Sequence, residues 1–118
     1  MIKIKRIYEP IAAADGRRIL VDRLWPRGVS KTKAGVTLWT REVAPSDKLR
    51  KWFGHEPEKW PEFRRRYRAE LKLKSAELDR ISAEAGKSDV TLLFAAKDEQ
   101  RNNAVVLREY LDKRRKKP

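Results

Sequence analysis

Charged side chains occur at the end of the apolar segment 19–25 and in the loop that follows it. The residues that could contact a ligand there are Asp22, Arg23, Arg27 and Lys31. Guanidinium groups present forked donors that match the oxygens of a phosphate or a carboxylate, and a lysine adds a compact positive charge. This combination of residue types favours binding of an anion.

A second group of polar residues, Lys97, Asp98, Asn102 and Asn103, follows the apolar segment 90–97. Asn102 and Asn103 precede a predicted helix, whose first N–H groups would also attract an anion. In open α/β sheets, ligands bind beyond the carboxyl ends of the strands. If the two segments are neighbouring strands, we therefore expect one pocket for an anionic small molecule that carries a phosphate or carboxylate, such as a nucleotide.

Asp22 and Arg23 also have a structural interpretation, as ion pairs that fix the register of a strand. Their positions predict that they point to opposite faces of a continuing strand and cannot pair with each other. Each then needs another partner, for which Lys97 and Asp98 are candidates across the sheet. Arg27 follows Pro26 in a loop and is the preferred contact for a ligand.

His55 is the only histidine and the only candidate for acid–base catalysis near neutral pH. It stands between a helix stop at Gly54 and Pro57, with no nucleophile or acid beside it in the sequence, so a capping role is the alternative. The absence of cysteine excludes thiolate nucleophiles and disulfides, and with one histidine we expect neither a metal site nor a cofactor. A hydrolase or transferase of unknown specificity is an alternative to simple binding.

The chain carries a formal net charge of +13, which would attract polyanions. The basic residues at the C-terminus are Lys113, Arg114, Arg115, Lys116 and Lys117. A nucleic-acid-binding protein that uses this segment and the basic surface is therefore a further alternative, and its binding would weaken steeply with salt.

Hydropathy patterns predict how these residues are positioned. The segment 2–8 alternates apolar and basic residues like an edge strand, whereas 19–25 and 90–97 are apolar on both faces and should be buried strands. With helical segments between them, the pattern predicts an α/β fold, a small three-layer domain with a largely parallel central sheet flanked by helices. We expect one domain over residues 1–112 and a flexible basic tail over 113–118.

The helices have recognisable boundaries. Ser46 and Gly54 predict a helix over Asp47–Phe53, and an apolar stripe predicts a long helix over 58–85 with a break near Lys74 and Ser75. Asp98 is the expected cap of the last helix. The segment 36–44 fits either an edge strand or a short helix.

No segment approaches the length of apolar sequence that a membrane span needs, and the first residues lack the apolar block of a signal peptide. We therefore expect a cytoplasmic protein with no membrane partner.

Several longer strings occur in order along nearly the whole chain, within the segments Arg6–Pro10, Asp15–Lys31, Ala44–Pro57, Phe63–Leu71 and Val90–Asp98. Among them, DRLWPRG and LRKWFGH make the chain resemble the short, single-domain branch of the YeaO-like family, domain of unknown function 488. Because that family is uncharacterised, the resemblance implies a fold and its boundaries but no reaction.

The resemblance also bears on catalysis. Members of the short branch commonly carry Asn-His-Ala at the start of the last helix, where this chain has Asn102, Asn103 and Ala104. Asparagine donates hydrogen bonds but does not exchange a proton near neutral pH. Longer relatives end the second buried strand in a segment of the Cys-His-Arg type, and that chemistry does not carry over to a chain without cysteine. The resemblance therefore favours binding over catalysis.

Overall fold

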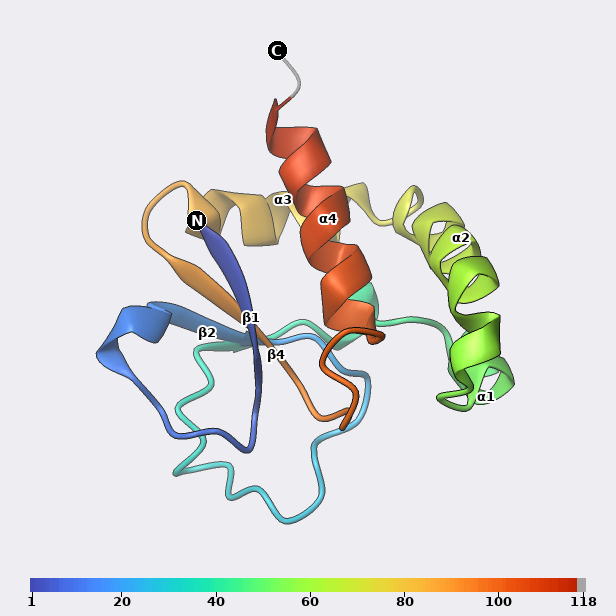
Figure 1. The fold of residues 1–118 in the computed structure, drawn as a ribbon. Helices are drawn as coiled ribbons and strands as arrows, with labels where there is room; N and C mark the ends of the chain where they lie inside the picture. The colour runs from blue at the N-terminus through green and yellow to red at the C-terminus, as the bar shows by residue number, and fades with distance from the viewer. Residues whose placement is uncertain (117–118) are drawn as a thin grey trace.

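Four parallel strands form the sheet in the computed structural model, which describes residues 1–116 (Figure 1). They are β1 (Ile2–Arg6), β2 (Arg17–Leu20), β3 (Leu38–Trp39) and β4 (Val90–Phe94), in the order β1-β4-β2-β3. The predicted α/β fold with a parallel sheet is confirmed, as is the edge position of β1. Because β2 and β4 are neighbours, the loops that follow them leave the same edge of the sheet.

Four helices cover one face of the sheet: α1 (Asp47–Phe53), α2 (Trp60–Leu71), α3 (Ser75–Ala85) and α4 (Asn103–Lys116). Helix α4 packs on β1 and β4, and α2 and α3 both pack against α4. Ile19 of β2 and its partner Leu92 of β4 are fully buried in the core beneath these helices. The predicted break near residue 74 is confirmed, because the apolar stripe divides between α2 and α3.

The opposite face of the sheet is covered by loop rather than by helix. Leu20 and Leu93, one position along from Ile19 and Leu92, point to this face because side chains alternate along a strand. The apolar residues that pack there come mostly from the segment around residues 21–39: Trp25, Val29, Val36 and Trp39, with Ala95. The long loop between β2 and β3 is therefore a layer of the domain.

Both central strands end earlier than the apolar segments predict. Strand β2 stops at Leu20, and β4 stops at Phe94. Beyond Val21, the Asp22 carboxylate accepts the hydrogen bond of the Ala95 N–H in place of a main-chain carbonyl. The prediction that Asp22 and Arg23 sit on opposite faces of a continuing strand is wrong, because both lie in the bend after β2.

The ambiguous segment 36–44 contains both a short strand and a helical turn. The two residues of β3 pair with β2, and a 3₁₀ turn over Arg41–Val43 follows. Two further 3₁₀ turns cover Ala13–Asp15 and Pro57–Lys59.

The residues that cap α1 are those that the sequence predicts, whereas α4 is capped by a different residue from the one predicted. The Ser46 hydroxyl accepts from the Leu49 N–H at 3.1 Å, and Gly54 ends α1 in a left-handed conformation, as predicted. The predicted cap by Asp98 is wrong: Asn102 accepts from the Val105 N–H at 3.1 Å. Asp98 instead accepts from N–H groups within its own loop.

Helix α4 continues through Lys116, so it includes most of the segment predicted to be a flexible tail. Lys117 lies outside the described residues. Within the described part of the chain, no helix is both long enough and apolar enough to cross a membrane.

Candidate functional site

A cavity of about 400 Å³ opens where β2 and β4 end. Six residues that the sequence analysis singled out line it: Asp22, Arg23, Arg27, His55, Asn102 and Asn103. The loop after β2 and the start of α4 thus meet at one site, as their position beyond neighbouring parallel strands predicts.

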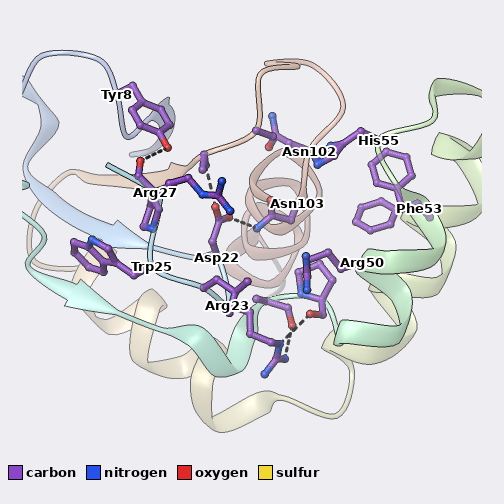
Figure 2. A pocket seen from close by; sticks show the side chains of 17 residues that line it. Tyr8, Asp22, Arg23, Trp25, Arg27, Arg50, Phe53, His55, Asn102 and Asn103 are labelled. Atoms are coloured by element: carbon purple, nitrogen blue, oxygen red, sulfur yellow. Dashed lines mark hydrogen bonds between the residues drawn. The ribbon is translucent and has the colours of Figure 1, made fainter. Parts of the chain in front are cut away.

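The cavity has two walls with Asp22 and Asn103 between them, as Figure 2 shows. One wall carries Tyr8, Trp25 and Arg27, and the other carries Arg50, Phe53 and His55. Each wall therefore combines aromatic rings with at least one arginine.

Asp22 connects three elements at the centre of the site. Its Oδ2 accepts from the Ala95 N–H at 2.9 Å, at the end of β4, and its Oδ1 accepts from Asn103 Nδ2 at 3.0 Å, at the start of α4. Asn103 Nδ2 also donates to the Val21 carbonyl at 3.0 Å. The carboxylate is held by donors on both oxygens, so its position is fixed by the fold.

The environment of Asp22 reduces its tendency to carry charge. Burial raises the pKa of the carboxyl above the ordinary value of 3.8, because a low-dielectric surrounding disfavours the ionised form. Hydrogen bonds from Asn103 and Ala95, and the nearby charges of His55 and Arg50, act in the opposite direction but do not cancel the effect of burial.

Arg23 holds the segment that leads into α1. Its Nε donates to the Pro45 carbonyl at 3.2 Å and its Nη2 donates to the Ala44 carbonyl at 3.2 Å, while Asp47 lies 4.0 Å from the guanidinium. The expectation that Lys97 or Asp98 would be the partner of Arg23 or Asp22 is wrong. Arg23 therefore lines the cavity with a guanidinium that is already partly engaged.

The guanidinium groups of Arg27 and Arg50 make fewer contacts within the protein than that of Arg23. Arg27 is exposed, and within the described residues its side chain makes no ion pair or hydrogen bond. Its carbonyl accepts from the Tyr8 hydroxyl at 3.0 Å, which fixes the loop. Arg50, on α1, has only a 3.4 Å contact from Nη2 to Asp47.

His55 follows the left-handed Gly54 and itself has a φ of 58°. A positive φ is uncommon for a residue with a side chain and costs free energy unless the surroundings hold it. The imidazole lies against Phe53, with ring centroids 5.9 Å apart. The unusual backbone places the His55 side chain at the wall of the cavity.

Three candidate residues do not line the cavity. Lys31 lies over the Trp25 ring at 5.8 Å, Lys97 is exposed, and Asp98 forms an ion pair with Arg101 at 3.0 Å. Asn102 does line it, but the amide is buried and is used to cap α4 and to bond the Asp98 carbonyl.

Sequence reasoning missed Tyr8, Arg50, Phe53 and Phe63 as lining residues. Arg50 and Phe53 belong to the predicted helix 47–53, and its boundaries alone did not show that it docks beside the end of β2. Tyr8 follows the edge strand, far from the other site residues in the chain. Within the described residues, no group of three or more His, Cys, Asp or Glu side chains is placed to hold a metal ion.

Comparison with known proteins identifies the family. A family model described as "Inactive DUF488-N3 subclade" matches residues 1–117. The chain is 44% identical to the uncharacterized protein YeaO of Escherichia coli K12 over 110 residues, which are 93% of this chain and 96% of YeaO. It is 42% identical over 113 residues to the uncharacterized protein Rv3073c of Mycobacterium tuberculosis H37Rv, covering 96% of this chain and 95% of that protein.

No solved structure shows a significant match to the chain. The family model covers nearly all of the sequence, and the similarity to YeaO extends over most of both proteins. The chain therefore belongs to the DUF488 family, and within it to the YeaO-like proteins.

Proposed function

We propose that this protein binds a small anion, carrying a phosphate or a carboxylate, in the cavity where β2 and β4 end. The observation that supports this most directly is the charge of the lining: Arg23, Arg27 and Arg50 face one acidic residue, Asp22. Both oxygens of Asp22 already accept hydrogen bonds, and burial raises its pKa. An incoming anion thus meets guanidinium groups that still have unused donors, and a carboxylate whose two oxygens already accept hydrogen bonds.

Binding without catalysis is the form of this proposal that the family favours, since its subclade is described as inactive. Asn103 stands where the YeaO-like resemblance leads us to expect a histidine, and its amide is used as a donor to Asp22 and Val21. A hydrolase or transferase would depend on His55 as the proton carrier in this cavity.

Titration with inorganic phosphate and with sulfate, followed by the amide signals of the ¹⁵N-labelled protein, tests the proposal. We expect the largest shifts around Arg27, Arg50 and Asn103. The double variant R27Q/R50Q should bind both ions about tenfold or more weakly, because it removes charge-assisted hydrogen bonds. The control variant R80Q removes one positive charge from an exposed position on α3 and should bind as the unaltered protein does. Equal affinities of R27Q/R50Q and R80Q would contradict the proposal.

A basic groove between α2 and α4 supports a second candidate function, nucleic-acid binding. The groove is lined by Arg65, Arg68, Lys72 and Lys113, with the aromatic ring of Tyr110 and one acid, Glu109. Arg115 is exposed, whereas Arg114 pairs with Asp79 at 2.8 Å. Proteins that bind single-stranded nucleic acids combine a positively charged groove with aromatic side chains.

Fluorescence anisotropy with a labelled single-stranded oligonucleotide, measured over a series of salt concentrations, tests this second function. The variant R68Q/K72Q should bind the oligonucleotide more weakly. A plot of log affinity against log salt concentration should also be less steep for this variant. R27Q/R50Q should leave that slope unchanged if the groove alone is the site. Failure to bind at low salt would exclude this candidate.

A further inference from the structure

Two exposed apolar side chains stand at the mouth of the cavity. Within the described residues, the large hydrophobic side chains that are exposed are Met1, Tyr8, Ile11, Leu24 and Leu73. Tyr8 and Leu24, 47% and 61% exposed, line the cavity. Apolar surface in a concave site that also carries a few polar groups is typical of a site that binds an organic ligand.

The Tyr8 ring is held in place although it is exposed. Its hydroxyl donates to the Arg27 carbonyl at 3.0 Å, and the Arg6 guanidinium lies 4.9 Å from the ring centroid. A ring that is already ordered loses little conformational entropy when a ligand packs on it. Tyr8 therefore offers a preformed flat surface to the cavity.

The opposite wall is also aromatic. Phe53 and Phe63 stack with centroids 4.3 Å apart, and the His55 ring lies next to Phe53. All three residues line the cavity. Figure 2 shows Phe53 and His55 on the side away from Tyr8, so a ligand that fills the space lies between two walls that carry aromatic side chains.

The cavity is larger than an inorganic anion requires. Its volume of about 400 Å³ falls in the range of sites for small organic ligands. A water molecule takes about 30 Å³ in the liquid, so a tetrahedral oxyanion would fill a minor part of this space. An apolar group attached to the anion would displace water from Tyr8 and Leu24.

We infer that the natural ligand is a small aromatic anion, an aryl phosphate or an aromatic carboxylate. Its ring lies between the wall of Tyr8 and the wall of Phe53 and His55, and its anionic group faces Arg27 and Arg50. This inference rests on the proposed anion-binding function and adds the chemical class of the ligand.

A series of probes tests the inference by calorimetry or by amide shifts at constant ionic strength: inorganic phosphate, phenyl phosphate, cyclohexyl phosphate, benzoate and phenol. Burial of a phenyl ring is expected to make phenyl phosphate bind about tenfold or more tightly than inorganic phosphate. Phenyl phosphate should also bind more tightly than cyclohexyl phosphate, because stacking on aromatic rings favours a flat group. Tighter binding of benzoate than of phenyl phosphate would identify the carboxylate, and weaker binding of benzoate would identify the phosphate.

The outcomes separate the two proposals. Equal affinity for inorganic and phenyl phosphate would overturn the aromatic ligand and leave anion binding intact. Phenol binding as tightly as phenyl phosphate would overturn anion binding itself, and no binding by any probe would overturn both. Preference for cyclohexyl phosphate would show that the site selects apolar groups but not aromatic ones, which also contradicts the inference.

Variants at exposed positions show where the ring of the ligand binds, without disturbing the core of the protein. L24A should weaken phenyl phosphate by about threefold to tenfold, through lost apolar contact, and leave inorganic phosphate unaffected. Y8A should weaken phenyl phosphate more than Y8F does, because both variants lose the hydrogen bond to the Arg27 carbonyl and only Y8A loses the ring. Y8F retains the ring and should preserve most of the affinity. L73A makes the same change as L24A at a residue that is 88% exposed and does not line the cavity, so it should change neither affinity. Equal effects of L24A and L73A would show that the ring of the ligand does not bind beside Leu24.

Discussion

Asp22 is the residue on which the geometry of the site depends. The carboxylate accepts from the Ala95 N–H and from Asn103, and so joins the ends of two strands to the first turn of α4. Burial raises its pKa above 3.8. Its protonation state should therefore affect an anion bound beside it.

The affinity for sulfate should rise as the pH falls. Neutralising Asp22 removes a negative charge from the cavity, and because the pKa of the carboxyl is raised, this begins above pH 3.8, the ordinary value. Sulfate is the suitable probe because its own charge does not change in this range. The dissociation constant is measured by calorimetry in an H55Q background, so that the imidazole does not contribute.

The same residue supplies the control. In D22N/H55Q the affinity for sulfate should no longer depend on pH, within the range where circular dichroism shows a folded protein. A pH dependence that persists in this double variant would assign the effect to another group.

The loop after β4 and the start of α4 are held by a single helix cap. Asn102 is buried, accepts from the Val105 N–H, and donates to the Asp98 carbonyl at 2.9 Å. It therefore fixes both the start of α4 and the loop after β4. The neighbouring Asn103 reaches Asp22 only because α4 begins here.

Replacement of Asn102 should destabilise the whole domain more than replacement of Asp98. N102A loses the cap and leaves the Val105 N–H and the Asp98 carbonyl without their partner, so the free energy of unfolding should fall by about 1–2 kcal/mol. N102S restores an acceptor and should recover part of the loss. Urea denaturation measures these differences, and a greater loss in D98A than in N102A would contradict the assignment of the cap.

At the scale of the whole molecule, a buried ion pair connects the strands on the face that carries no helix. Arg18 of β2 donates to Asp15 at 2.6 Å, and both side chains are buried. Lys5 of β1 also contacts Asp15, at 3.1 Å, and Thr91 of β4 donates to its carbonyl at 2.7 Å. Asp15 thus links three neighbouring strands.

The stability of the fold should depend on the ionisation of Asp15. Burial by itself raises the pKa of this carboxyl, but hydrogen bonds from the Ala12 N–H, Lys5 and Arg18 outweigh burial and bring the pKa below 3.8. Its stabilising contribution is therefore complete above pH 3.8 and is lost as the pH falls through the lowered value.

D15N should lower the free energy of unfolding by about 3 kcal/mol near neutral pH, because it leaves the buried Arg18 guanidinium without its counter-ion. Urea denaturation over a pH series measures this. The difference between D15N and the unaltered protein should shrink at acid pH, where Asp15 is protonated in both states. A difference that is independent of pH would show that D15N lowers the free energy of unfolding through altered packing and not through the lost charge.

The sequence by itself determined the features that depend on local pattern. Apolar residues on both faces predicted two central strands. The stripe over 58–85 predicted a long helix with a break in it, and Ser46 and Gly54 predicted the ends of α1. Such patterns are readable because burial and capping act on residues close together in the chain.

The tertiary structure alone decided where the strands end and which side chains share the cavity. Leu24 and Trp25 continue the apolar pattern of β2, yet the strand stops because the Asp22 carboxylate takes the Ala95 N–H. Tyr8 and Arg50 reach the cavity through the docking of a β1 loop and of α1. These outcomes follow from contacts between residues far apart in the sequence, which no local pattern encodes.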